Sequence, residues 1–162
     1  MIRHWPDPIL GEKAAPRPVD ESLRAIGDRL RRAAEAAEAY GLAAQHVGAV
    51  APVVVVSVSP PDAPRDYRVL YNPELLAVSG PEEKGEEGSV ALPGLVVDIM
   101  RPSAARIGFD DESGVRHELE LLGFAARVAM HEIDQMNGVF FLERLSRLQR
   151  ERALKRFKKQ AS

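Results

Sequence analysis

The sequence predicts an α+β fold in a single domain; the order of the elements indicates the class, and length and composition indicate one domain. The predicted elements come as one helix, a block of strands and then two helices, an order typical of α+β proteins because strands and helices do not alternate. The chain has 162 residues, 45% of them hydrophobic, which suits one domain with a sizeable core. Because no repeat, low-complexity tract or linker interrupts the chain, we expect a single domain over residues 1–162.

The first part of the chain predicts an extended arm followed by a helix. Prolines interrupt any helical period over residues 1–20, and apolar anchors lie at Ile2, Trp5, Ile9 and Leu10. Helical periodicity extends over residues 21–40, with Asp20 as the expected N-cap and Gly41 as the glycine that ends the helix. The buried stripe of this helix is expected at Leu23, Ile26, Leu30 and Ala34.

The middle of the chain predicts strands. The β-branched run over residues 53–58 predicts a buried strand, and residues 67–78 predict a second strand region that is broken at Asn72. Residues 80–88 are polar and acidic, so we expect a surface loop there. Strands are predicted over residues 95–109 and 115–121, with a hairpin turn at residues 110–114 between them. Two helices follow, over residues 123–137 and 146–159, and the second is basic and amphipathic.

Composition excludes several functional classes. With 28% charged residues and a formal net charge of −2, the chain shows no electrostatic bias toward DNA or an anionic membrane. The absence of cysteine excludes disulfides, thiolate metal ligands and cysteine nucleophiles, and fits a reducing compartment. No apolar run suits a signal peptide or a membrane span, so we expect a cytoplasmic protein.

The segment His131-Glu132-Ile133-Asp134-Gln135 is one residue short of a metal-hydrolase motif. In the His-Glu-x-x-His pattern, two imidazoles four residues apart lie on one face of a helix, and the Glu is the general acid/base. Here the first His and the Glu are present, whereas Gln135 takes the place of the second His.

Two further segments complete a set of three. Residues 41–48 read Gly-Leu-Ala-Ala-Gln-His-Val-Gly, and residues 87–94 read Glu-Gly-Ser-Val-Ala-Leu-Pro-Gly. In this order and spacing, the chain resembles the peptide deformylase family, whose motifs are G-φ-G-φ-A-A-x-Q, E-G-C-φ-S and H-E-x-x-H. The resemblance covers essentially the whole chain. It implies antiparallel strands packed around a central helix that carries the third motif, with a helix at the C-terminus.

The resemblance also implies roles for individual residues. The family removes the N-formyl group from nascent polypeptides, a step of protein biosynthesis, with a divalent metal held by one Cys and two His. These ligand positions fall on Ser89, His131 and Gln135. The general acid/base falls on Glu132, and the oxyanion donors fall on the side chain of His46 and the backbone of Val90. The substrate-binding positions fall on Tyr40, Gly41, Leu42 and Leu92.

The departures from the family motifs fall mainly at positions with a chemical role, and less at positions with a structural one. A neutral Ser hydroxyl is a poor ligand for iron or zinc, and a Gln amide oxygen suits calcium or magnesium better. Among the ligand positions, His131 alone keeps its family residue. By contrast, Glu87 and Arg101 are retained as an expected structural pair. We therefore expect either no metal or a weakly bound zinc or iron ion, and deformylase activity that is lost or strongly reduced.

Alternatives remain open at this point. His46 and His131, with Glu132, form a candidate rearranged zinc site in an active metallohydrolase for formylated or acylated amines. Ser89 with His46 or His131 as base is a candidate metal-free nucleophile. In a purely structural interpretation, His131 hydrogen-bonds to Gln135 or Ser89. The expected ligand is a formylated or acylated peptide or a small acyl compound, and the basic C-terminal helix is a candidate contact with ribosomal RNA.

Overall fold

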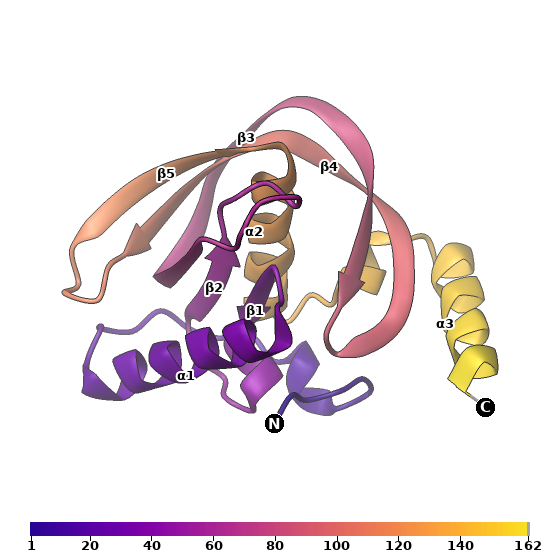
Figure 1. Cartoon of the computed structure of the whole chain (residues 1–162), viewed down its shortest axis with the longest axis horizontal. Helices are drawn as coiled ribbons and strands as arrows, with labels where there is room; N and C mark the ends of the chain where they lie inside the picture. Colours follow the sequence, from indigo (N-terminus) through magenta and orange to yellow (C-terminus); the bar gives the residue numbers. More distant parts are fainter. Residues whose placement is uncertain (162) are drawn as a thin grey trace.

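Two long antiparallel strands, β3 (Tyr67–Ser89) and β4 (Leu92–Asp110), form the frame of the molecule. With β1 (Gly41–Ala43), β2 (Val53–Ser57) and β5 (Arg116–Leu122), they make a five-stranded antiparallel sheet in the order β1-β2-β3-β4-β5. The structure is a computed structural model that describes residues 1–161, so residue 162 of the predicted domain lies outside the described residues. The sheet arches over the helix α2 (Gly123–Met136), as Figure 1 shows. The α+β class and the central helix are confirmed.

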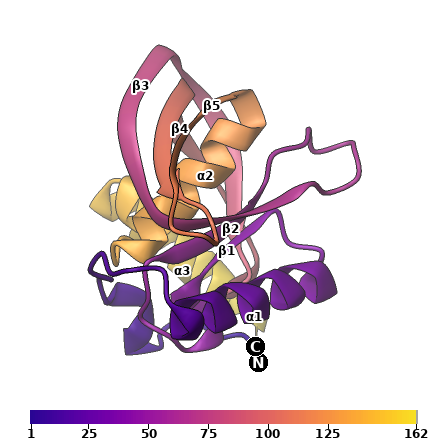
Figure 2. The same ribbon diagram turned by 90° about the vertical axis from the view of Figure 1, so that its left-hand side faces the viewer.

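The other helices lie around this frame. The helix α1 (Glu21–Ala37) packs against β1 and β2, and α3 (Arg147–Ala161) lies beside β4, apart from the other helices (Figures 1 and 2). Short 3₁₀ turns occur at η1 (Pro8–Gly11), η2 (Ala44–Val47) and η3 (Phe141–Arg144).

The start of α1 follows the sequence, but its end does not. Asp20 is the N-cap, and its carboxylate accepts a hydrogen bond from the Leu23 N–H at 2.8 Å. The helix ends at Ala37 because Glu38 adopts a left-handed conformation, with φ 52°, and its N–H reaches back to helix carbonyls. The prediction that Gly41 ends the helix is wrong. Gly41 instead begins β1, a strand that the sequence analysis did not predict.

The buried stripe of α1 differs from the prediction at one position. Leu23, Leu30 and Ala34 are buried as expected, whereas Ile26 is half-buried and Gly27 takes its place. Gly27 is required there because the ring of Tyr71 occupies the space that a Cβ atom would need. The contact brings α1 close to β3.

The acidic segment 80–88 is a strand, not the predicted surface loop. It continues β3 and pairs with β4 from Glu82 opposite Pro102 to Gly88 opposite Val96. Polar side chains are tolerated because much of this ribbon is exposed while its backbone groups are paired across the ladder. The break predicted at Asn72 is a register shift within β3, where Asn72 has φ 46°.

The predicted hairpin at residues 110–114 is confirmed. The Asp111 carboxylate accepts hydrogen bonds from the N–H groups of Ser113 and Val115, and Gly114 supplies a φ of 81°. The turn ends β4 and starts β5, which leads directly into α2.

The N-terminal arm (residues 1–14) contacts all three motif segments. The Arg3 N–H donates to the His46 carbonyl at 2.7 Å, and the Trp5 N–H donates to the Ala91 carbonyl at 2.8 Å. The Ala14 N–H donates to the Met136 carbonyl at 3.0 Å. The predicted arm is therefore observed as a segment that contacts all three motifs, but it is not extended throughout, because Pro8–Gly11 form the turn η1.

Candidate functional site

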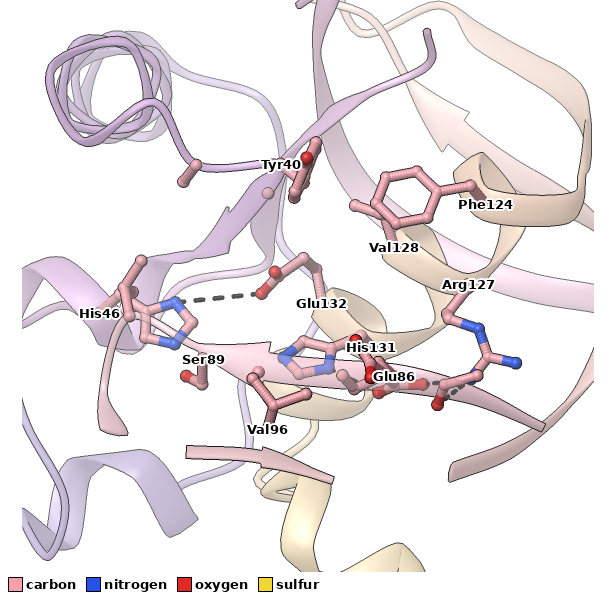
Figure 3. A pocket seen from close by; sticks show the side chains of 16 residues that line it. Tyr40, His46, Glu86, Ser89, Val96, Phe124, Arg127, Val128, His131 and Glu132 are labelled. Atoms are coloured by element: carbon pink, nitrogen blue, oxygen red, sulfur yellow. Dashed lines mark hydrogen bonds and ion pairs between the residues drawn. The ribbon is translucent and has the colours of Figure 1, made fainter. Parts of the chain in front are cut away.

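The three motif segments meet at one cavity of about 700 Å³. Its walls come from β1, η2, the end of β3, the start of β4 and α2 (Figure 3). Most of the predicted site residues line it: Tyr40, Gly41, His46, Ser89, Val90, His131 and Glu132. Leu42 and Leu92 instead lie in the apolar core, and Gln135 is buried outside the cavity lining.

The helix α2 presents two side chains to the polar end of this cavity. It is buried on most of its surface because strands pack against it from several sides, so neighbouring positions both reach the interior. His131 and Glu132 thereby line the same cavity although they are adjacent in sequence. Figure 3 shows Glu132 directed toward His46.

His131 is held by a buried carboxylate. Its Nδ1 lies 2.8 Å from Oε1 of Glu87. Arg101 donates to the same carboxylate, from Nε to Oε2 at 2.6 Å and from Nη2 to Oε1 at 2.9 Å. Burial alone would raise the pKa of Glu87, but hydrogen bonds from His131 and Arg101 outweigh it and lower the pKa to about 2. Glu87 is therefore ionised, and His131 Nδ1–H is the donor of this bond. In the purely structural interpretation, His131 was expected to hydrogen-bond to Gln135 or Ser89, but its partner in the structure is Glu87.

The same cluster ties α2 to the sheet. Arg127 of α2 reaches Glu87 at 2.8 Å, and Arg101 of β4 reaches Asp134 at 3.0 Å. Burial lowers the pKa of His131, but the carboxylates of Glu132 and Glu87 outweigh burial, so the net shift of the pKa is upward. The pairing of Glu87 with Arg101 that the sequence suggested is thus confirmed, and it extends to the histidine of the third motif.

His46 is held in one tautomer. Its Nδ1 accepts a hydrogen bond from the Ala43 N–H at 3.0 Å, so the proton of the neutral ring is on Nε2. The side chain is 1% exposed, and Nε2 has no hydrogen-bond partner. Burial, followed by the charge of His131, lowers the pKa of His46 to about 3. At neutral pH, His46 is therefore an uncharged donor with a free N–H.

Glu132 lies beside His46 without a partner for one oxygen. Its Oε1 is 3.9 Å from His46 Nδ1, beyond hydrogen-bond distance, and is buried with no hydrogen bond. Burial raises the pKa of Glu132 to about 7, although the charge of His131 opposes this shift. Gly41 makes room for the side chain, since a Cβ atom there would lie 2.8 Å from Glu132 Cγ.

Gln135 and Ser89, which the sequence analysis expected at metal-ligand positions, make other contacts. Gln135 Nε2 donates to the Leu10 carbonyl of the N-terminal arm at 2.6 Å. Ser89 Oγ accepts from the Ala91 N–H at 3.1 Å, which stabilises the tight turn that contains Val90 between β3 and β4. Within residues 1–161, no group of three or more His, Cys, Asp or Glu side chains is arranged to hold a metal ion.

An aromatic rim borders the apolar part of the cavity. The rings of Tyr40 and Phe124 are 4.7 Å apart in an edge-to-face arrangement, and the Arg65 guanidinium lies 3.9 Å from the centre of the Tyr40 ring. The sequence analysis did not assign a site role to Phe124 or Val128. Both were detectable, because they precede Glu132 by eight and four residues on the same helical face.

Comparison with known proteins identifies the family. The family model described as polypeptide deformylase matches residues 1–151. The chain belongs to the polypeptide deformylase family. A peptide deformylase-like protein of Rhizobium meliloti is 38% identical over 159 residues, which cover 98% of this chain and 91% of the relative. A peptide deformylase of Mesorhizobium japonicum is 34% identical over 157 residues, covering 96% of this chain and 89% of the relative.

Solved deformylases have the same fold. The peptide deformylase of Ehrlichia chaffeensis in complex with actinonin superposes with a TM-score of 0.88 at 29% identity, covering 98% of this chain and 95% of the other. The predicted peptide deformylase fold is confirmed. Among residues 1–161, no helix is both long enough and apolar enough to cross a membrane.

Proposed function

We propose that this member of the deformylase family binds formylated or otherwise acylated peptide ends in the cavity, with deformylase activity lost or strongly reduced. The observation that carries the proposal is the position of Gln135. At the place of the second metal-binding His, its amide group is bound to the Leu10 carbonyl of the N-terminal arm. A side chain whose amide group is already hydrogen-bonded to the backbone is a poor replacement for an imidazole ligand.

The other donors support the same conclusion. Ser89 offers a neutral hydroxyl, and a neutral oxygen is a weak ligand for iron or zinc compared with a thiolate. His131 keeps one ring nitrogen on Glu87, which leaves Nε2 as a possible ligand atom. Catalytic metal sites have three protein ligands, whereas this site offers one imidazole. The residues present therefore do not fit the divalent metal of the family.

The cavity itself is retained. It combines apolar walls at Tyr40, Phe124 and Val128 with a polar end at His46 and Glu132, a combination typical of sites for ligands with one polar group. The related Ehrlichia protein binds actinonin. We infer that an acylated peptide lies here with its acyl group at the polar end, close to the backbone of Val90.

A reversion experiment tests the proposal. The wild-type protein should release no measurable amine from N-formyl-methionyl-alanine when purified anaerobically and supplied with iron, zinc or nickel, while still binding the peptide. The triple variant S89C/H46Q/Q135H restores the family residues and should bind about one metal ion and regain activity. Wild-type turnover comparable to that of the reverted protein would contradict the proposal, and so would failure of the wild type to bind the peptide.

The alternative is an active metallohydrolase with a rearranged metal site of His46 and His131. Its support is that both imidazoles line one cavity with Glu132. Its difficulty is that His46 Nε2 carries the ring proton while Nδ1 is bound to Ala43, so neither nitrogen offers a lone pair. Near-stoichiometric metal in the wild type that is lost in H46A, but not in the matched surface variant H117A, would favour the alternative.

Two further expectations remain proposals. We place the protein in the cytoplasm, and we propose that the basic face of α3 contacts the ribosome. Exposed cations along α3 support the contact, among them Arg152 and Lys155. Co-sedimentation with ribosomes that is reduced in the double variant R152E/K155E would support it. Equal co-sedimentation of the two proteins would contradict it.

A further inference from the structure

A guanidinium group lies in the wall of the cavity, beside the apolar side chains of α2. Phe124, Arg127 and Val128 all line the cavity, because positions three and four residues apart share one face of a helix. Figure 3 shows Phe124 and Arg127 on the same side of the cavity. The side chain of Arg127 is 12% exposed, so it is largely removed from water. One cationic group therefore interrupts the apolar part of this wall.

Gly85 of β3 leaves the space that this guanidinium occupies. A Cβ atom at residue 85 would lie 2.7 Å from Cζ of Arg127 and 2.8 Å from both Nε and Nη2. Gly85 is not among the glycines with positive φ, so the close approach, and not the backbone conformation, requires glycine here. The two residues act together, since any side chain at residue 85 would displace the guanidinium from its place in the wall.

The protein uses only part of the hydrogen-bonding capacity of Arg127. Its Nη1 donates to the Glu87 carboxylate and to the Ile99 carbonyl, each at 2.8 Å, and its Nη2 donates to the Glu83 carbonyl at 2.8 Å. A guanidinium has five N–H groups. Among residues 1–161, no acceptor takes the N–H of Nε or the second N–H of Nη2. A ligand that displaces water from this wall must therefore supply an acceptor, or leave these groups unpaired.

The charges around Arg127 favour a neutral acceptor. Its positive charge is already paired with Glu87 at 2.8 Å, and Glu86 also lines the cavity. A ligand carboxylate would bring a further negative charge next to these two. A hydrocarbon or thioether group would cover the N–H groups without accepting a strong hydrogen bond. A neutral oxygen atom avoids both costs.

We propose that Arg127 selects acylated peptides whose first side chain ends in a neutral oxygen acceptor, either a sulfoxide or a carboxamide. The inference rests on the proposed function, because it names the side chain of the ligand bound there. With the acyl group at the polar end, this side chain lies along Phe124 and Val128, and its oxygen accepts from Arg127. Arg127 is thus a specificity-determining residue, and Gly85 is the positioning residue that makes room for it.

Four peptides that differ in one side chain test this assignment. They are N-formyl-Xaa-alanine amides in which Xaa is methionine, methionine sulfoxide, glutamine or glutamate, and calorimetry in buffer with EDTA gives the Kd of each. The wild type should bind the sulfoxide at least about tenfold more tightly than the thioether, because the two differ only by the acceptor oxygen. It should also bind the glutamine peptide more tightly than the glutamate peptide. Comparing the sulfoxide with the glutamine peptide shows which source of the oxygen fits better.

Variants separate recognition from a structural role. R127M should bind the sulfoxide and thioether peptides equally, whereas damage to the scaffold alone would weaken all four peptides and leave their ratios unchanged. G85A keeps the cation but displaces it, so it should reduce the preference for the sulfoxide, and it decides the question if R127M does not fold. R152M, at an exposed cation of α3, is the matched control and should keep the preference of the wild type.

The outcomes distinguish this inference from the proposed function. If the wild type binds none of the four peptides, both are overturned. If it binds the sulfoxide and thioether peptides equally, or if R127M keeps the wild-type preference, the role of Arg127 is overturned while binding of acylated peptides stands. Tighter binding of the glutamate peptide than of the glutamine peptide would overturn the assignment of a neutral acceptor.

Discussion

Replacing Glu132 by Gln should stabilise the protein in a manner that depends on pH. Glu132 is buried, and the pKa of its carboxyl group is raised from 4.5 to about 7, so ionising it costs more in the folded state than in the unfolded state. A pKa difference of one unit corresponds to about 1.36 kcal/mol. The cost to folding therefore reaches about 3 kcal/mol once the carboxyl group is ionised in both states.

The sign follows from proton binding. Below pH 4.5, both states hold the proton, and Glu132 has no pH-dependent effect on stability. Between pH 4.5 and about 7, the folded state holds the proton that the unfolded state has lost, so stability falls as pH rises. The free energy of unfolding of E132Q relative to wild type should thus increase by about 3 kcal/mol across this interval and then stay constant.

His46 has the opposite effect on the pH dependence of the free energy of unfolding. The pKa of His46 is lowered from 6.5 to about 3, so its contribution to stability is present above pH 6.5 and is lost as pH falls toward 3. Between pH 4.5 and 6.5 the effects of His46 and Glu132 oppose each other in the wild type. The E132Q variant should therefore show a stability that rises with pH where the wild type is nearly level.

Urea denaturation at half-unit steps from pH 4 to pH 8.5 measures this difference directly. The matched control is E118Q, at an exposed glutamate of β5, which removes a carboxylate without removing a burial cost. Its difference from wild type should not vary with pH. A pH-independent difference for E132Q as well would refute the reasoning, because it would mean that Glu132 ionises as easily in the folded state as in the unfolded one.

Three other substitutions have expected effects on the free energy of unfolding, each measurable by urea denaturation at pH 7. Gln135→Leu leaves the Leu10 carbonyl without its partner and should cost about 1–3 kcal/mol; an unchanged midpoint would show that the arm does not depend on this bond. Gly41→Ala places a methyl group 2.8 Å from Glu132 Cγ and should cost about 1–3 kcal/mol, whereas Gly11→Ala, in open space, should cost much less. Glu87→Gln leaves buried cations uncompensated and should cost about 3–5 kcal/mol; a smaller loss than for the exposed pair variant Glu35→Gln would contradict the role given to this carboxylate.

Local patterns in the sequence predicted the helices well, because their signals lie within a few residues. The N-cap at Asp20 and the period of α2 are examples, and the latter correctly placed His131 and Glu132 on one buried helix. The strand over residues 80–88 was missed because its acidic side chains indicate solvent, whereas its structure depends on pairing with β4. The residues of one strand do not reveal which other strand will pair with it, and this pairing is what stabilises the segment.

The chemistry of the site was less accessible for a similar reason. The sequence identified His46, but its tautomer depends on a backbone N–H of Ala43 that only the fold directs at the ring. The sequence identified Gln135 as a departure from the family motif, but not the carbonyl of Leu10 that it binds. In each case, the decisive partner is a backbone group, and backbone groups are the same in every residue.

The N-terminal arm gives the site a particular order of assembly. The hydrogen bond from Gln135 to Leu10 joins residues that are 125 positions apart, and the arm also contacts His46 and Ala91 on the way. During synthesis, Leu10 emerges well before Gln135, which follows it by 125 positions, so the arm waits for its partner on α2. Because α2 supplies one wall of the cavity, the cavity is complete only after this late segment has been synthesised and has packed against the strands.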